Sequence, residues 1–452
     1  MSANAPPRAE ATLDDKYTLE KGQVFMTGIQ ALVRLPIEQR RRDRAAGLHT
    51  AGYVSGYQGS PLAAIDGALR KAQAHLDAHD VLFRPGVNEE LAATAVHGTQ
   101  FVGMFPGSKV DGVFAIWYGK GPGVDRAVDA LRHAAWSGTS RRGGMLVLAG
   151  DDHGGKSSTV ACYSDLVFES CAMPLLYPSS VQEILDFGLH GIAMSRYAGV
   201  PVGMKLVMDI VESAGTVALS PDSPRIAEPG DYTPPPDGLE IRPFEMALLP
   251  VEKRLYHERL YAALAYARAN GLNQITMTSP GARIGIVSSG KSYQDVRKAL
   301  YALAIDEARA SELGVRVLKI GMPWPIEPSI VREFAHGLET LIVVEEKRPL
   351  IEDQLRSILY GGADAPRIIG KVRQGHLYDA QPQWQFPNFG ELSASMVADL
   401  LADLLADRAR SCPSETALVF GDTRLTYAEL DGRINQLARR LLESGAGPER
   451  VV

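Results

Sequence analysis

Three stretches of the sequence combine polar, acidic and small residues in patterns that could carry chemistry. They are SGYQGSPLAAID (55–66), PGVNEELAATAVHGTQ (85–100) and AGDDHGGKSST (149–159). Each lies where a short apolar run, of the kind that forms a buried strand, comes to its end. Open α/β sheets bind their ligands at the carboxyl ends of the strands, so these stretches are the first candidates for a site.

The second stretch places Asn88, Glu89 and Glu90 at the start of a helical pattern. On residue chemistry alone, Asn88 is a good helix N-cap, and two glutamates in the first turn complement the helix dipole. A carboxyl group at that position could instead exchange a proton with a bound ligand. The residues by themselves leave both interpretations open.

The pattern G-x-x-x-x-G-K-S, typical of phosphate-binding loops, occurs at 150–157 and again at 285–292. In the first match, Asp151 and Asp152 would lie inside the phosphate cradle and repel a polyanion. In the second, Ile286 and Val287 belong to an apolar run, so the first glycine is a strand residue and not a loop entrance. We therefore expect both matches to be strand-to-helix turns, with a phosphate-loop nucleotidase as an alternative.

Short apolar runs alternate with amphipathic stretches from about Tyr17 onward, which favours an α/β fold with a parallel or mixed sheet. Residues 219–238 are dense in proline, aspartate and glycine and predict a linker. Three later apolar runs with helical patterns between them suit a second, smaller domain. The expected organisation is a disordered lead-in (1–16), a first domain (17–218), a linker with connecting helices (219–274), a small α/β domain (275–372), a linker and helix (373–410) and a separate piece (411–452).

The composition is that of an ordinary soluble protein, with 452 residues, 45% hydrophobic and 22% charged residues and a net charge of −6. This charge gives no basis for binding nucleic acid or an anionic membrane. No apolar run approaches the length of a membrane span, and the polar start lacks the core of a signal peptide, so we expect a cytoplasmic protein. Its three cysteines are too few and too scattered for a disulfide framework or a four-thiolate cluster, and we expect no metal site in the chain.

The three stretches, together with YGKGPGVDR (118–126) and the opening segment 19–57, closely resemble the single-chain bacterial indolepyruvate ferredoxin oxidoreductases. Segments 185–207 and 321–355 extend this resemblance, which covers roughly residues 17 to 405. The family implies a doubly wound sheet of the thiamine-diphosphate-binding, pyrimidine-domain type, followed by a smaller domain like the C-terminal domain of transketolase. It also implies oxidative decarboxylation of a 2-oxo acid to an acyl-CoA, with ferredoxin as electron acceptor.

In that family an acidic residue at a helix start bonds N1′ of the cofactor's aminopyrimidine, which helps to remove the proton from the thiazolium carbon. The segment NEELAATAVHG matches this pattern and implies that Glu89 is the catalytic carboxylate, with Glu90 as the fallback. Further residues are implied in the site, although a turn hydroxyl or a structural histidine and serine would explain them equally well. They are Gly59, Ser60 and Pro61 beside cofactor and substrate, and Asp152, His153 and Ser157 along the 2-oxo acid.

The sequence lacks the Gly-Asp-Gly motif with which the other half of such an enzyme binds magnesium and the diphosphate, and it lacks the family's iron–sulfur cysteine motifs. We therefore expect Mg²⁺ and 4Fe–4S clusters on a diphosphate-binding half or second subunit, within a homo- or hetero-oligomer that also uses ferredoxin and coenzyme A. Residues 412–452 instead resemble the start of an adenylate-forming domain of peptide synthetases and acyl-CoA ligases, with LTYAEL (425–430) as its first core motif. The chain ends as a strand begins there, and we expect a truncation at that point.

The leading hypothesis is an oxidoreductase fragment that supplies the cofactor-activating half of a thiamine diphosphate site and is incomplete alone. An alternative from another class is a non-catalytic scaffold module in a chain fused to a peptide synthetase adenylation domain. A complete adenylation domain after Val452 would favour the fusion. A nearby reading frame with Gly-Asp-Gly would favour a split oxidoreductase.

Overall fold

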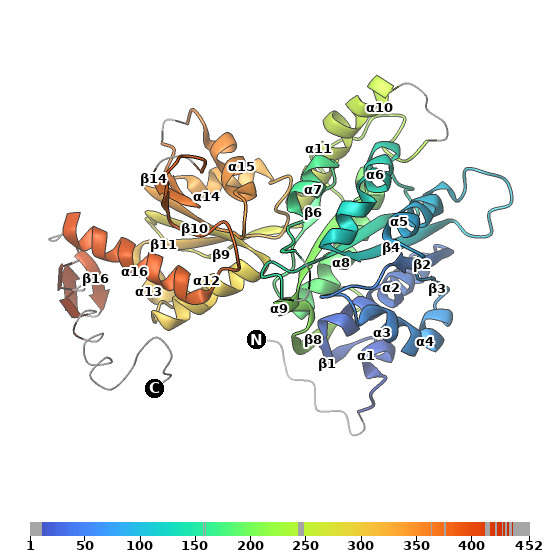
Figure 1. Ribbon diagram of the computed structural model, residues 1–452, viewed down its shortest axis with the longest axis horizontal. Helices are drawn as coiled ribbons and strands as arrows, with labels where there is room; N and C mark the ends of the chain where they lie inside the picture. The colour runs from blue at the N-terminus through green and yellow to red at the C-terminus, as the bar shows by residue number, and fades with distance from the viewer. Residues whose placement is uncertain are drawn as a thin grey trace.

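The computed structural model describes residues 11–156, 158, 160–242, 248–362, 364–374, 377–411, 416–420 and 423–426, with short pieces at 428–429, 432–433 and 436. Within these residues the chain forms two α/β units, each built on a mainly parallel sheet (Figure 1). The α/β fold class expected from the alternating apolar and amphipathic runs is confirmed.

The first unit is built on a six-stranded parallel sheet in the order β3-β2-β4-β5-β7-β6. Its strands β5 and β7 are buried along their whole length, as expected for strands that helices cover on both faces. The strands are β2 (Thr50–Gly56), β3 (Val81–Phe83), β4 (Gly112–Lys120), β5 (Met145–Asp151), β6 (Leu175–Leu176) and β7 (Val202–Val207).

Helices cover both faces of this sheet. α2 (Gly28–Ala45) and α8 (Val181–Ala198) pack together on one face, and α5 (Glu89–Gly98) and α6 (Gly121–Ser137) pack together on the other. Shorter elements complete the unit: α1 (Asp15–Thr18), α3 (Ile65–Lys71), α4 (Gln73–Asp77), η1 (Thr99–Phe101), α7 (Asp165–Ser170), α9 (Met208–Val211) and an antiparallel pair, β1 (Gly22–Thr27) with β8 (Ala214–Leu219).

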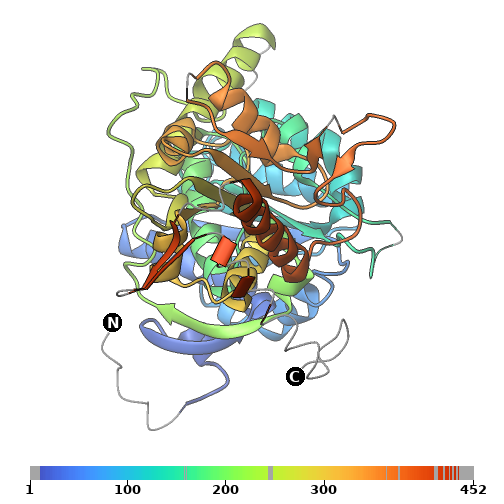
Figure 2. The same ribbon diagram turned by 90° about the vertical axis from the view of Figure 1, so that its left-hand side faces the viewer.

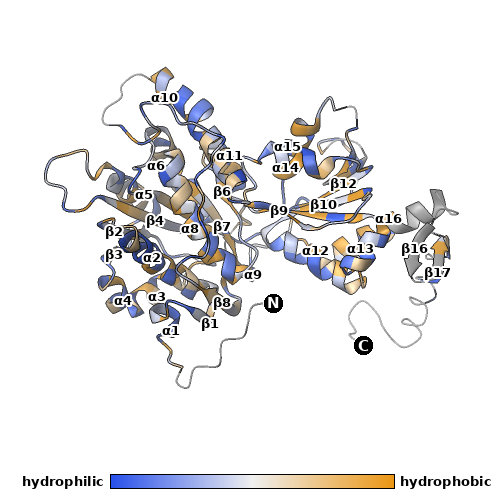
Figure 3. Ribbon diagram, turned by 180° about the vertical axis from the view of Figure 1, so that it is seen from behind, coloured by the Kyte–Doolittle hydropathy of each residue, from blue (hydrophilic) through white to orange (hydrophobic). Residues whose placement is uncertain are grey.

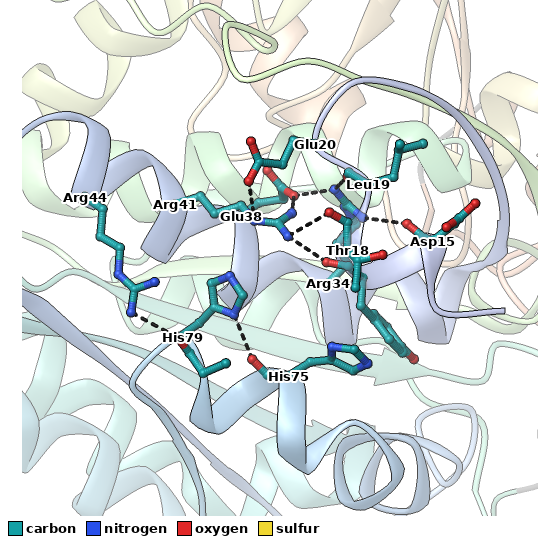
Figure 4. Close-up of polar contacts among 12 residues, drawn as sticks. Asp15, Thr18, Leu19, Glu20, Arg34, Glu38, Arg41, Arg44, His75 and His79 are labelled. Atoms are coloured by element: carbon teal, nitrogen blue, oxygen red, sulfur yellow. Dashed lines mark hydrogen bonds and ion pairs between the residues drawn. The ribbon is translucent and has the colours of Figure 1, made fainter. Parts of the chain in front are cut away.

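The buried Arg34 of α2 anchors the start of the described chain (Figure 4). Its guanidinium donates to the carbonyl oxygens of Lys16, at 2.6 Å, and Leu19, and it pairs with Glu38 at 2.5 Å. Arg41 bonds the same carboxylate at 2.6 Å. A buried guanidinium needs such partners for its donors, so these bonds fix the N-terminal segment against α2.

Residues 220–242 carry no helix or strand, and the chain then forms a helical connection. Its elements are α10 (Leu248–Arg254), the π-helix η2 (Leu255–Arg259) and α11 (Leu260–Ala269). Arg259 is 2% exposed and donates to the carbonyl oxygens of Trp136 (2.8 Å) and Ser137 (3.1 Å) at the end of α6. A cation at a helix C-terminus is favourable, and this contact holds the connection to the first unit.

The second unit is a five-stranded sheet in the order β13-β12-β10-β11-β9, with β9 antiparallel. Hydrophobic residues concentrate in its strands and fill a core on each face (Figure 3). Its strands are β9 (Asn273–Met277), β10 (Ile284–Ser289), β11 (Val315–Ile320), β12 (Thr340–Val344) and β13 (Arg367–Ile369), and its helices are α12 (Gly290–Ala302), α13 (Glu307–Leu313), α14 (Pro328–Ala335), α15 (Leu350–Leu359) and α16 (Ala394–Ser411). Two antiparallel strand pairs lie on either side of α16 in the chain. They are β14 (Val372–Gln374) with β15 (Gln383–Trp384) before it, and β16 (Thr416–Phe420) with β17 (Thr423–Thr426) after it.

The two sheets meet at their carboxyl edges. After β6, the backbone amide of Tyr177 donates to the carbonyl of Gly321, just beyond β11, at 2.9 Å. The ring of Tyr177 also packs on Gly290, the first residue after β10, where an added Cβ would lie 2.3 Å from the ring. Figure 2 views the molecule from the side of the second unit, which lies in front of the first. Loops at the carboxyl ends of both sheets therefore share one interface.

Candidate functional site

The first sheet has a topological switch point between β2 and β4. The chain leaves β2 toward β3 on one side and returns to form β4 on the other, so the loops after β2 and β4 diverge. Such a divergence creates the crevice in which open α/β sheets bind ligands. Gly59, in the loop after β2, packs on the side chain of Lys120 at the end of β4, since a Cβ there would stand 2.7 Å from it. The predicted Gly59-Ser60-Pro61 turn thus packs on the carboxyl end of β4, at the switch point.

Glu89 is the first residue of α5, and it lies against β4 and the start of α6. The Asn88 side chain accepts a hydrogen bond from the amide of Leu91 at 2.9 Å, which confirms the expected N-cap. The indole nitrogen of Trp117 on β4 donates to the carbonyl of Glu89 at 3.0 Å. Glu89 is 7% exposed, whereas Glu90 points to solvent. Of the two glutamates in the first turn, only Glu89 has a buried side chain that could act on an enclosed ligand.

The start of α6 lies directly against the Glu89 side chain. A Cβ on Gly123 would stand 2.7 Å from Cγ and 2.9 Å from Oε1 of Glu89, so no larger residue fits without a shift. Arg126, one turn later, places its Nε 4.0 Å from Oε2 of Glu89. The sequence prediction did not assign either residue a function. The signal was present in YGKGPGVDR, because glycine inside a helix is costly and points to a close approach.

The end of β5 joins the same edge of the sheet. Gly150 packs on the turn after β2, since a Cβ there would stand 3.1 Å from Pro61 and 2.9 Å from Leu62. Asp151 is fully buried and accepts hydrogen bonds from the amide (2.8 Å) and hydroxyl (2.6 Å) of Ser164. Burial raises the pKa of Asp151 to about 6, even though the nearby ammonium of Lys205 lowers it.

The next two residues are buried beneath the second unit. Asp152 is 2% exposed, and its carboxylate accepts the amides of Lys156 (3.0 Å) and Ser158 (3.1 Å), so it holds its own loop in shape. His153 is also 2% exposed, and burial, together with the neighbouring lysines, holds its pKa well below 6.5. The imidazole is therefore neutral near pH 7, and its Nε2 has no hydrogen-bond partner among the described residues. Ser157 lies outside the described residues.

The lysines of the two phosphate-loop patterns are both engaged by carboxylates. Lys156 pairs with Glu391 at 2.6 Å, and Lys291 pairs with Asp295 at 2.9 Å and Glu346 at 3.3 Å. The second helix begins at Gly290, after a strand that runs through residue 289, as the strand-to-helix turn prediction expects. These contacts give no support to a nucleotide phosphate site.

Glu89 has the chemistry that an aminopyrimidine requires, because a buried carboxyl group at a helix start can share a proton with a ring nitrogen. A metal-bound diphosphate has no comparable ligand set here. In the part of the chain that the structure describes, no group of three histidine, cysteine or acidic side chains could hold a metal ion. None of its helices is long and apolar enough to cross a membrane.

Residues 274–422 match the protein family described as the indolepyruvate oxidoreductase domain. The chain is 26% identical over 351 residues to indolepyruvate oxidoreductase subunit IorA of Methanothermobacter thermautotrophicus, a match that covers 76% of this chain and 50% of the relative. The IorA subunit of Pyrococcus abyssi is 25% identical over 364 residues, which are 79% of this chain and 50% of that one. The chain thus spans about half the length of these curated relatives. The similarity supports the expected family, and its single-chain bacterial form stays a prediction.

A solved 2-oxoglutarate:ferredoxin oxidoreductase from Magnetococcus marinus, with 2-oxoglutarate, coenzyme A and succinyl-CoA bound, has a similar fold. The TM-score is 0.59 at 15% identity, covering 85% of this chain and 65% of that chain. A short separate similarity links this chain to tyrocidine synthase 2 of Brevibacillus parabrevis. It is 52% identical over 46 residues, 10% of this chain and 1% of that protein.

Proposed function

We propose that this chain supplies the aminopyrimidine-activating half of a thiamine diphosphate site in an oxidoreductase that acts on an arylpyruvate such as indolepyruvate. The observation that carries the proposal is the buried Glu89 carboxylate at the start of α5, packed against the glycine at position 123. The named activities of the relatives, which act on 2-oxo acids, support the substrate class. The chain spans about half the length of those relatives, and we propose that the complete activity needs the part that it does not match.

Bound thiamine diphosphate would supply the nucleophilic carbon that attacks the 2-oxo acid. The part of this chain in the reaction is to exchange one proton at a fixed atom. Glu89 would hold the proton between its carboxylate and N1′ of the aminopyrimidine, and the contact with α6 would keep the carboxylate in place. The walls of the crevice would exclude water from this bond, which strengthens it.

The substrate would lie along the same carboxyl edge. We propose that the Ser60 hydroxyl faces the reacting carbonyl, because its turn packs on Lys120 and Gly150 at the crevice. His153 would contribute as a neutral hydrogen-bonding group, consistent with its lowered pKa. The contacts of Asp152 favour a loop-holding contribution over direct contact with substrate. Mg²⁺, the diphosphate and 4Fe–4S clusters would be bound by the second part, which would pass electrons to ferredoxin and form an acyl-CoA.

Titration calorimetry with thiamine diphosphate and Mg²⁺ tests the proposal, on the chain alone and with a diphosphate-binding half from the family. We expect binding and arylpyruvate decarboxylation only when the half is present, and loss of decarboxylation in Glu89→Gln. Glu90→Gln is the matched control, because it removes the same charge one residue away on the solvent side. Full activity in Glu89→Gln, or equal loss in the two variants, would contradict the assignment.

We keep as an alternative proposal a non-catalytic scaffold module in a fusion with an adenylation domain, while the similarity to tyrocidine synthase 2 covers only 10% of this chain. That module would fail to bind thiamine diphosphate with any diphosphate-binding half. The same calorimetry therefore separates the two proposals.

A further inference from the structure

The turn after β12 contains a residue in a strained backbone conformation. Lys347 has φ +52°, in the left-handed region that non-glycine residues rarely adopt. A residue stays in that region only where its surroundings fix it, and such residues cluster at active sites, ligand clamps and switch regions.

Hydrogen bonds that the side chains of both preceding residues accept hold this turn in place. The Glu345 carboxylate accepts the amides of Ile351 (2.8 Å) and Glu352 (2.9 Å) and so caps α15. The Glu346 carboxylate accepts the amide of Leu392 at 3.0 Å. Both glutamates are buried, so breaking either set would leave buried groups unpaired. These bonds leave the next residue no freedom to relax its backbone.

The strained backbone aims the Lys347 side chain at the first unit. Its ammonium donates to the carbonyl oxygen of His153 at 2.5 Å, and the residue is 8% exposed. Burial lowers the pKa of Lys347, although the neighbouring Glu346 opposes this. Lysine normally keeps its ammonium in water, so a buried ammonium bonded to one carbonyl is a specific contact between the two units.

The carbonyl that Lys347 holds lies near the start of the loop after β5, which runs from 152 to 164. The amides of Gly155 (3.2 Å) and Cys162 (3.0 Å) donate to the carbonyl of Asp152, one residue earlier, while the Asp152 side chain binds two further loop amides. The loop also carries the exposed Lys156–Glu391 pair, whose lysine side chain is 55% exposed. The Tyr163 hydroxyl, later in the same loop, donates to the carbonyl of Arg348 at 3.3 Å. Exposed ion pairs contribute little, so the buried Lys347 bond is the strongest contact from the second unit to residues 152–156.

We infer that Lys347 is a positioning residue, through which the second unit sets the conformation of the loop 152–156 at the candidate substrate site. The link to substrate rests on the proposed function. The effect on the loop does not, because it follows from the contacts alone. On this inference Lys347 acts through the His153 carbonyl.

Hydrogen exchange of the full chain, followed by mass spectrometry, tests the effect on the loop. In Lys347→Met we expect the amides of 155–162 to exchange at least about tenfold faster, the factor for loss of one hydrogen bond to a charged group. Amides of β10 and β12 should be unchanged. Lys347→Arg should restore protection in part, and Lys347→Gly should lose it even though glycine relieves the backbone strain. Lys156→Met is the control and should exchange like the wild type.

Wild-type exchange in both Lys347→Met and Lys347→Gly would overturn the inference, and so would equal loosening in Lys156→Met. If the Met variant unfolds as a whole, the Gly variant carries the same test. In the enzyme completed with a diphosphate-binding half, we expect Lys347→Met to raise KM for the arylpyruvate about tenfold with a smaller change in kcat, and Lys347→Arg to recover most of it. Failure of Glu89→Gln to abolish decarboxylation would refute the proposed function but leave the exchange result intact.

Discussion

Gly123 offers a test of whether the position of Glu89 matters for cofactor activation. In Gly123→Ala, the added methyl group would stand 2.7 Å from Cγ and 2.9 Å from Oε1 of Glu89. Favourable contacts between such atoms are about 3.5–4.0 Å, so α6 or the glutamate side chain must shift by about 1 Å. The substitution thus displaces the carboxylate without changing its chemistry.

The expected size of the effect follows from that displacement. A shift of about 1 Å at a reacting group costs on the order of 100-fold in rate. Overpacking costs about 1–3 kcal/mol, of which about 0.5–1 kcal/mol is offset because alanine favours the helix. We therefore expect a folded protein, destabilised by about 0–2.5 kcal/mol, whose complex decarboxylates arylpyruvate on the order of 100-fold more slowly.

The assay combines the decarboxylation rate of the completed enzyme with urea unfolding of the chain. Gly98→Ala is the matched control, because it changes the last residue of α5 and its Cβ would meet nothing within 4 Å. A wild-type rate in a folded Gly123→Ala protein would refute the reasoning that α6 sets the position of Glu89. A comparable loss of rate in Gly98→Ala would refute it as well.

Two predictions concern the buried charges near the end of β5. Lys205 and Asp165 form a 2.7 Å ion pair, with their side chains 2% and 5% exposed. Lys205→Met leaves the buried carboxylate unpaired and should lower the free energy of unfolding, measured in urea, by about 3–5 kcal/mol. Adding Asp165→Leu should restore more than half of this loss. Asp151 has a pKa of about 6 in the folded protein against 3.8 unfolded, so its contribution to stability is present below pH 3.8 and is lost as the pH rises to about 6. The free energy of unfolding of Asp151→Asn should therefore rise relative to that of the wild type between pH 4 and pH 7, by at most about 3 kcal/mol. If the difference in free energy of unfolding between the two proteins stays constant over that range, the raised pKa of Asp151 is contradicted.

The sequence was sufficient to predict the alternation of strands and helices, the N-cap at Asn88 and the edge of the sheet on which the candidate site lies. These features depend on local signals, namely apolar runs, capping residues and the ends of strands. It was also sufficient to identify Gly285 as a strand residue. The same local reasoning could not choose between Glu89 and Glu90, because burial of one glutamate depends on how α6 packs against α5.

Features that depend on packing between the two units could not be predicted from the sequence. Nothing in the run of residues after β12 indicates that Lys347 turns its ammonium into the first unit. Its direction follows from hydrogen bonds made by Glu345 and Glu346 to distant backbone groups. The burial of Asp152 and His153 has the same origin, since the second unit covers a loop that sequence reasoning left open to a ligand.

The meeting of the two sheets at their carboxyl edges has a thermodynamic consequence. A ligand that binds the crevice only when the loops are in their native arrangement stabilises that arrangement by RT ln(1 + [L]/Kd). Because the loop after β5 is bonded to the turn after β12, this mass-action term acts on both units. The junction thereby couples ligand binding at the first unit to the thermal unfolding of the second.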